Sequence, residues 1–153
     1  MGPDVQGTVL IPVTGADRKT ADVVREFVTY LRGGADPWAL LSEQAVVIVN
    51  GTTPLSGRYP GIALIRGILV DSAKNVIGSL SVGISEVIGT GARVAALLSL
   101  SGQSVAGAPF NEEGRLCGCV FAVRGGLIEE IILFPDTSLI EIALYQRKYV
   151  PDA

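Results

Sequence analysis

The side chains most able to do chemistry in this sequence are two cysteines, Cys117 and Cys119, because the chain contains no histidine. A Ser-His-Asp triad or a Cys-His pair needs an imidazole base, so neither can be built here. Two cysteines without a third cysteine or a histidine also make a poor zinc site, and no phosphate-binding loop or dinucleotide fingerprint occurs. We therefore expect no metal and no cofactor.

The spacing of the two cysteines favours a structural role. Residues two apart on a strand point to the same face, but their backbones are poorly placed for a disulfide. We interpret Cys117 and Cys119 as small buried hydrophobes with free thiols. Free thiols are typical of a reducing compartment, so the sequence predicts a cytoplasmic protein.

Composition predicts one folded domain that binds neither nucleic acid nor a membrane. The formal net charge is −3 and Lys and Arg form no cluster, so a phosphate backbone or an anionic lipid surface is not an expected partner. No window approaches the roughly 18 uninterrupted apolar residues of a transmembrane helix. With 48% hydrophobic and only 18% charged residues, the 153-residue chain favours apolar surface beyond one core, for a partner or a cavity.

The first half of the chain has helical periodicity. One apolar stripe at helical spacing is formed by Val23, Val24, Phe27 and Leu31. The pair Gly33-Gly34 ends this helix, and Asp36-Pro37 suits the N-cap and first residue of a short second helix. A buried strand over residues 45–49 and a loop over 50–57 should precede a third helix at about 61–72.

After about residue 77 the periodicity changes to that of strands. Four strands separated by short turns are expected at 80–88, 93–101, 116–123 and 127–134. Asp136 and Thr137 then suit the start of a last helix that ends near Tyr145. Helices first and meandering strands after predict a segregated α+β fold with an antiparallel sheet.

Both faces of the predicted sheet are apolar. Along residues 93–101 the side chains on either side of the strand are largely hydrophobic, and over residues 75–111 only Glu86 and Arg93 are charged. An antiparallel sheet with one face in water should instead alternate apolar and polar residues. We therefore expect one face to pack on the helices and the other on a second copy of the chain, in a homodimer.

The boundaries of the domain follow from the same patterns. Residues 1–16 are expected to form an N-terminal tail, and Asp17 to open the first helix. Residues 17–147 are expected to form the single domain, and residues 148–153 a C-terminal tail.

Two stretches of the sequence together resemble one family. The first, WALLSEQAVVIVNGTTPLSGRYPG from Trp38 to Gly61, is similar to the helix, first strand, PLSG-x-Y-x-G loop and third helix of SnoaL-like and ketosteroid-isomerase-like proteins. The second, from Gly107 to Leu144, is similar to their final hairpin and the step into their last helix. Over residues 20–146 the order and spacing resemble the SnoaL-like branch of the nuclear transport factor 2-like superfamily.

The resemblance implies a cystatin-like cone. In that fold a strongly bent antiparallel sheet wraps about three N-terminal helices, a short C-terminal helix follows, and a deep pocket remains at the open end. Such folds host many functions, so the chemistry has to be argued from the residues that line the pocket.

The register of the last hairpin determines which of its residues face that pocket. The segment from Val123 to Leu127 suits a three-residue loop with Gly126 in the left-handed bulge position. The expected cross-strand pairs are then Val123–Leu127, Phe121–Glu129, Cys119–Ile131 and Cys117–Leu133.

Cross-strand partners share a face, so this register puts Ile131 and Leu133 on the pocket side together with the cysteines. A two-residue loop would place Ile132 and Phe134 there instead. We prefer the longer loop because it agrees with the way the family faces its pocket.

The residues that catalyse reactions in related enzymes are missing. By the resemblance, the base, tyrosine and neutral acid of a ketosteroid-isomerase-like enzyme would stand at Val49, Phe27 and Cys119. The Asp-Arg-Asp set of a limonene-epoxide-hydrolase-like enzyme would lie at about residues 97–101, which hold no charge, and the acid of a SnoaL-like cyclase would fall at Leu133. We expect no steroid isomerisation, and whether the protein is an enzyme stays open.

A set of mostly apolar residues remains as candidate pocket lining. Asp136, the one acid expected near the mouth of the cone, suits a helix N-cap first and a pocket acid as the alternative. The aromatic residues Trp38, Tyr59 and Phe110 suit either a pocket wall or plain core. The candidate ligand-binding residues are Phe27, Trp38, Val49, Tyr59, Phe110, Cys119, Phe121, Ile131, Leu133 and Asp136.

Two functions agree with these patterns. The first is a SnoaL-like pocket protein that binds an apolar small molecule, with isomerisation, cyclisation and dehydration as the candidate reactions. The alternative is a non-catalytic dimeric interaction module whose cone is filled by its own side chains. An internal cavity favours the first function, and a collapsed core favours the second.

Overall fold

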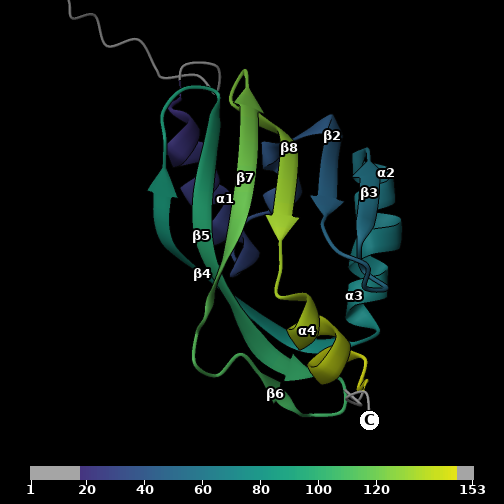
Figure 1. The fold of residues 1–153 in the computed structure, drawn as a ribbon. Coiled ribbons are helices and arrows are strands. Elements are labelled where there is room, and N and C mark those ends of the chain that lie inside the picture. The colour runs from purple at the N-terminus through teal and green to yellow at the C-terminus, as the bar shows by residue number, and fades with distance from the viewer. Residues whose placement is uncertain (1–17, 148–153) are drawn as a thin grey trace, which may run out of the picture.

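The computed structural model describes residues 18–147 and has the predicted α+β architecture (Figure 1). A seven-stranded sheet curls around helix α1 (Thr20–Leu31). Its strand order is β3 (Gly57–Pro60), β2 (Leu41–Val49), β8 (Leu127–Phe134), β7 (Leu116–Arg124), β5 (Arg93–Ser104) and β4 (Ile77–Ile88), and β6 (Pro109–Phe110) pairs with β5. The fold class, a cone with a cystatin-like arrangement, is thereby confirmed. The expected tails 1–16 and 148–153, and Asp17 as the opening of the first helix, lie outside the described residues.

Two helical segments lead into the sheet. Helix α1 (Thr20–Leu31) buries Val23, Val24 and Phe27 of the predicted apolar stripe, whereas Leu31 is exposed. The helix ends where Gly33 and Gly34 take φ values of 126° and 100°, which only glycine adopts readily. The short 3₁₀ helix η2 (Pro37–Leu40) begins at Asp36, whose carboxylate accepts a hydrogen bond of 3.0 Å from the backbone N–H of Trp38.

The third helical segment covers residues 62–74 and lies beside the sheet, with α2 and α3 next to β3 in Figure 1. It consists of α2 (Ile62–Leu64), the π-helical η3 (Ile65–Val70) and α3 (Asp71–Lys74). Within residues 18–147 no helix combines the length and the hydrophobicity needed to cross a membrane.

The long strands lie close to their predicted positions. They are β2 (Leu41–Val49), β4 (Ile77–Ile88), β5 (Arg93–Ser104), β7 (Leu116–Arg124) and β8 (Leu127–Phe134). Two short strands were not predicted, β3 (Gly57–Pro60) and β6 (Pro109–Phe110), because segments this short and rich in proline show too little periodicity.

One strand pair departs from the expected antiparallel arrangement. β2 and β8 run parallel, whereas the other described pairs are antiparallel. A parallel pair needs a long crossover connection, and residues 50–126 supply it through the third helical segment and the strands between. The sheet is therefore mixed at this one position.

The predicted loop of the last hairpin is wrong. The hairpin closes through two residues, Gly125 and Gly126, whose φ values of 61° and 78° suit a type I′ turn, and Arg124 pairs with Leu127. A three-residue loop was expected because, in a regular hairpin, that length puts Ile131 and Leu133 on the pocket side of the sheet.

A β-bulge restores that face. Val123 pairs with Ile128 but Ala122 pairs with Glu130, so β8 contains one extra residue, Glu129. Beyond the bulge Phe121 pairs with Ile131 and Cys119 with Leu133, two positions further along β8 than the predicted partners Glu129 and Ile131. Because the bulge shifts the pleat by one residue, Ile131 and Leu133 still share the face of Phe121 and Cys119.

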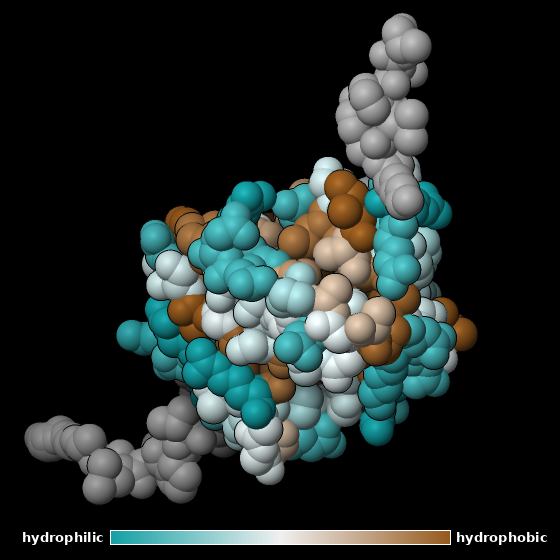
Figure 2. Space-filling model, turned by 90° about the horizontal axis from the view of Figure 1, so that it is seen from below, coloured by the Kyte–Doolittle hydropathy of each residue, from teal (hydrophilic) through white to brown (hydrophobic). Residues whose placement is uncertain are grey.

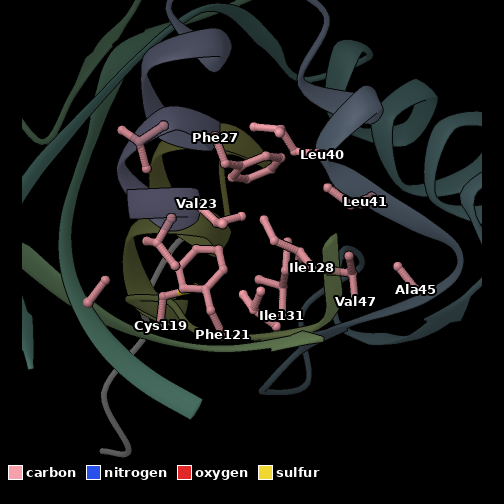
Figure 3. Close-up of a cluster of buried hydrophobic side chains, with 14 of the residues drawn as sticks. Val23, Phe27, Leu40, Leu41, Ala45, Val47, Cys119, Phe121, Ile128 and Ile131 are labelled. Atoms are coloured by element: carbon pink, nitrogen blue, oxygen red, sulfur yellow. The ribbon is translucent and has the colours of Figure 1, made fainter. Parts of the chain in front are cut away.

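The main core lies between α1 and the concave face of the sheet. Phe27 points from α1 towards Phe121, with Cys119 and Ile131 beside it on the sheet (Figure 3). The rings of Phe27 and Phe121 meet edge to face, with centroids 6.1 Å apart and an interplanar angle of 68°. This geometry is favoured by the ring quadrupoles and fixes the depth at which α1 sits in the cone.

A second, smaller apolar cluster lies at the lower end of the molecule in Figure 1, where α4 (Thr137–Leu139) and the π-helical η4 (Ile140–Leu144) meet β6. Its buried members are Leu55, Phe110, Ile140 and Leu144. The predicted last helix thus covers the end of the cone opposite the β7–β8 turn.

The β4–β5 ribbon bends near this end because Gly102 permits a close approach of the two strands. A Cβ atom at Gly102 would overlap the backbone carbonyl of Ser79 and lie 3.2 Å from the Cα of Leu80. Gly102 also pairs with Phe110 of β6, so the approach positions a residue of the second cluster.

We expect Gly102→Ala to lower the free energy of unfolding by about 2 kcal/mol or more, because the added methyl group meets backbone atoms that cannot move independently. Chemical denaturation measures this change. Gly67→Ala is the matched control, since a Cβ at that helical position meets nothing within 4 Å; it should stabilise by up to about 1 kcal/mol. Equal stability of the two variants would contradict the account of the bend.

Candidate functional site: an apolar cavity in the cone

A cavity of about 400 Å³ lies between the two apolar clusters. Phe27, Val49 and Phe121 of the main core form part of its wall, and Phe110 and Ile140 of the second cluster form another part. The end of the wall formed by Asn111, Arg115 and Asp136 is called the mouth, because Arg115 and Asp136 are exposed to solvent there. Apart from these three residues, every side chain on the wall is hydrophobic.

The strands supply the deepest part of this wall because alternate residues face inwards. On β5 the inward residues are Leu98 and Leu100, and on β8 they are Ile131 and Leu133. Helix α1 contributes only its last turns, through Phe27 and Leu31. The site is therefore formed mainly by the sheet.

Eight of the ten candidate residues lie on the cavity wall. They are Phe27, Val49, Phe110, Cys119, Phe121, Ile131, Leu133 and Asp136. Among the residues of β2 and the last hairpin, the face that the family resemblance favoured is the one that lines the cavity.

Trp38 and Tyr59 do not line the cavity, and for them the expected placement is wrong. Trp38 lines a separate outer groove, where the guanidinium carbon of Arg66 lies 5.8 Å from its ring centroid. Tyr59 packs against the main core, and its hydroxyl donates a hydrogen bond of 2.7 Å to the backbone oxygen of Leu55. Each aromatic ring thus has a structural contact that the sequence pattern could not reveal.

Other wall residues were not among the candidates. On β4 and β5 these are Ile77, Leu80, Val82, Leu98 and Leu100, and from the second cluster and the last helix they include Leu55, Leu139, Ile140 and Leu144. The strand residues could have been found from the apolar alternation along residues 93–101. The helical residues could not, because their contact with the cavity depends on how the last helix folds back.

Asn111 holds the loop at the mouth in place. Its amide nitrogen donates to the backbone oxygens of Leu100 at 2.9 Å and Arg115 at 3.0 Å, and its amide oxygen accepts from the N–H of Arg115 at 2.9 Å. Its φ of 52° is a left-handed conformation that asparagine tolerates. The Arg115 guanidinium in turn pairs with Glu113 at 2.6 Å.

Asp136 has the N-cap role that the sequence favoured and also lies on the wall. One carboxylate oxygen accepts a hydrogen bond of 3.2 Å from the backbone N–H of Leu139. Both expected placements, helix cap and cavity-lining acid, therefore apply to the same side chain.

The two cysteines are free and both face the cavity. Burial raises the pKa of Cys119 to about 12, with a smaller contribution from Cys117. The pKa of the half-buried Cys117 is also raised, first by burial and to a lesser degree by the nearby charge of Asp136. Both thiols are thus neutral near pH 7 and behave as hydrophobic wall.

The wall supports burial of an apolar molecule better than acid–base chemistry. Val49, Phe27, Cys119 and Leu133 all lie on the wall, and these are the positions to which the sequence resemblance assigns the base, tyrosine, neutral acid and cyclase acid of related enzymes. Within residues 18–147, no group of three or more His, Cys, Asp or Glu side chains is placed to hold a metal ion.

No protein-family profile matches the sequence. No curated protein is detectably similar to it in sequence either. Solved structures, in contrast, match over most of the chain.

An NTF2-like protein of unknown function from Burkholderia pseudomallei is 17% identical, with a TM-score of 0.69 over 81% of this chain and 95% of that chain. The fold is that of the nuclear transport factor 2-like proteins. TerC, crystallised with polyporic acid, is 15% identical, with a TM-score of 0.68 over 82% of this chain and 97% of that one. A candidate isomerase from Bacillus subtilis is 20% identical, with a TM-score of 0.65 over 83% and 93% of the two chains.

We expect the two cysteines to differ in reactivity. At pH 8 only about one Cys119 in 10⁴ is a thiolate, given its pKa of about 12, so iodoacetamide should label Cys117 first and Cys119 only after unfolding. Mass spectrometry of the native protein should therefore show one adduct, absent from Cys117→Ser, and two in denaturant. Rapid labelling of Cys119 in native Cys117→Ser would contradict the buried position of that thiol.

Proposed function

We propose that this protein binds an apolar small molecule in the cavity of the cone. The observation that carries the proposal is a cavity of about 400 Å³ whose wall is hydrophobic except at the mouth. Ligand sites are typically concave, mostly apolar and of roughly 300–1,000 Å³. Each Å² of apolar surface buried there contributes about 25 cal/mol before the costs of association.

A non-catalytic interaction module with a filled cone is the less favoured function. A filled cone should leave no space much larger than a water molecule, which occupies about 30 Å³. The side chains of Leu100 and Leu133 are only partly buried although they face inwards, which agrees with contact with the cavity.

Any reaction in this cavity would depend on shape more than on acid–base groups. The neighbours of the same fold include a candidate isomerase and a protein crystallised with polyporic acid, and they support ligand binding as a use of such a cone. Isomerisation, cyclisation or dehydration of an apolar compound are the reactions we would test first. A positioned base alone is usually worth roughly 10²–10⁴-fold in rate, so we favour binding over efficient catalysis here.

We expect Leu133→Trp to weaken binding of an environment-sensitive apolar dye, such as Nile red, at least about tenfold, because the indole occupies the volume that the dye needs. Fluorescence titration measures the affinity. Ile68→Trp is the control, since that side chain is 51% exposed on the third helical segment and lies away from the cavity wall. If both variants bind the dye like the unchanged protein, the dye site is elsewhere and the proposal fails.

We also propose a homodimer through the outer face of the sheet. Ile48 pairs with Ile132, Ile132 with Val120, and Val120 with Ala95, so an apolar row crosses four strands on that face. Phe134, also on the outer side, is 51% exposed. A second copy would remove this surface from water. Because both thiols are free, we further propose a reducing compartment such as the cytoplasm.

Leu97→Lys should convert this dimer to a monomer, because it places a charge within the apolar outer face. Light scattering at micromolar concentration should give twice the 15.9 kDa chain mass for the unchanged protein and the chain mass for the variant. Gln103→Lys, at an exposed position near the end of β5, should leave the dimer intact. A monomeric unchanged protein would refute the proposed interface.

A further inference from the structure

The cavity wall is polar at one end only. Its three polar residues come from three separate segments: Asn111 follows β6, Arg115 precedes β7 and Asp136 follows β8. Figure 2 looks at the molecule from this end and shows hydrophobic and hydrophilic residues interspersed on the surface. A ligand buried in the apolar part would therefore place one end of itself among these three side chains.

Two of the three polar groups are already engaged. The side-chain amide nitrogen of Asn111 donates to the backbone oxygens of Leu100 and Arg115, and its amide oxygen accepts from the backbone N–H of Arg115. The positive charge of Arg115 is paired with Glu113 at 2.6 Å. Neither side chain is free to recognise a ligand without breaking an existing contact.

Asp136 is different. One of its oxygens accepts the capping hydrogen bond from Leu139, but the carboxylate takes part in none of the ion pairs found within residues 18–147. Its negative charge also reaches the inside of the cavity, since it contributes, after burial, to raising the pKa of Cys117. Within the described residues, the mouth thus presents a carboxylate that caps a helix but has no ion-pair partner, at the end of a hydrophobic cavity.

We propose that the cavity selects apolar amines: molecules with a hydrophobic body that fills the cone and a cationic, hydrogen-bond-donating head that lies against the Asp136 carboxylate. This inference rests on the proposed ligand-binding function and names its ligand class. A hydroxyl head can donate to the same oxygen but lacks the charge, so it should bind less tightly. A carboxylate head meets like charge and should bind least tightly.

Asp136→Asn separates this role from helix capping. Asparagine is as good an N-cap as aspartate, so the variant should keep the start of α4 while it removes the charge. Asp71→Asn is the matched control, because Asp71 is an exposed acid on the outer groove and not on the cavity wall. Both variants change the net charge of the protein by the same amount.

Three probes that share one apolar body test the selection: 1-pyrenemethylammonium, 1-pyrenemethanol and 1-pyrenecarboxylate, each titrated by fluorescence at low salt. The ammonium should bind about five- to tenfold more tightly than the carboxylate, with the alcohol between them, because the attraction of the ammonium and the repulsion of the carboxylate, each up to about fivefold at an exposed site, multiply. The preference should shrink in 1 M salt. In Asp136→Asn the ammonium and carboxylate affinities should agree within about twofold, and in Asp71→Asn the order should persist.

The outcomes distinguish this inference from the proposed function. Equal affinities for the three probes, tighter binding of the carboxylate, or an unchanged preference in Asp136→Asn would overturn the amine selection while leaving an apolar binding cavity in place. Absence of binding by all three probes, or binding that Leu133→Trp does not weaken, would overturn the cavity proposal and this inference with it.

Discussion

The cavity exists because α1 is much shorter than the strands that curl around it. Its 12 residues span about 18 Å, whereas the 12 residues of β5 span about 40 Å. The edge-to-face contact of Phe27 with Phe121 fixes how deep α1 sits, and α1 ends at Leu31. Beyond that point Ile140 and its neighbours reach the wall without filling the space, so the concave face of the sheet is left to bind something else.

The two apolar faces of the sheet have different surroundings. The inner face carries Cys119 and Leu133, which meet the cavity, and the outer face carries Ile132 and Val120, one residue away along the same strands. An inner wall of neutral thiols and aliphatic side chains can contact a ligand through apolar area and complementary shape. This composition is the reason that we propose binding for this cone, although the same fold hosts other functions elsewhere.

Hydrophobic periodicity was sufficient to predict the order of the long elements, and the family resemblance supplied the cone. The candidate residues included residues of β2 and the last hairpin that face the cavity, such as Val49 and Phe121, but none of the wall residues of β4 and β5. Periodicity could not reveal the bulge at Glu129, because a bulge leaves the composition of the strand unchanged while it shifts every later partner by one. The predicted loop was one residue too long, and the bulge compensated for the difference. Trp38 and Tyr59 were misplaced because the apolar pattern does not show on which side an aromatic ring packs. The Trp38 ring lies beside Arg66, and Tyr59 packs against the main core with its hydroxyl bonded to the backbone oxygen of Leu55.

A high-resolution crystal structure of the purified protein tests the central claim most directly. We predict an open cavity of about 400 Å³ between Phe27, Leu100 and Leu133, with electron density for an apolar molecule after soaking with 1-pyrenemethanol. If these side chains instead meet one another and leave no space larger than a water molecule, the cone is a filled core. The binding function would then be wrong.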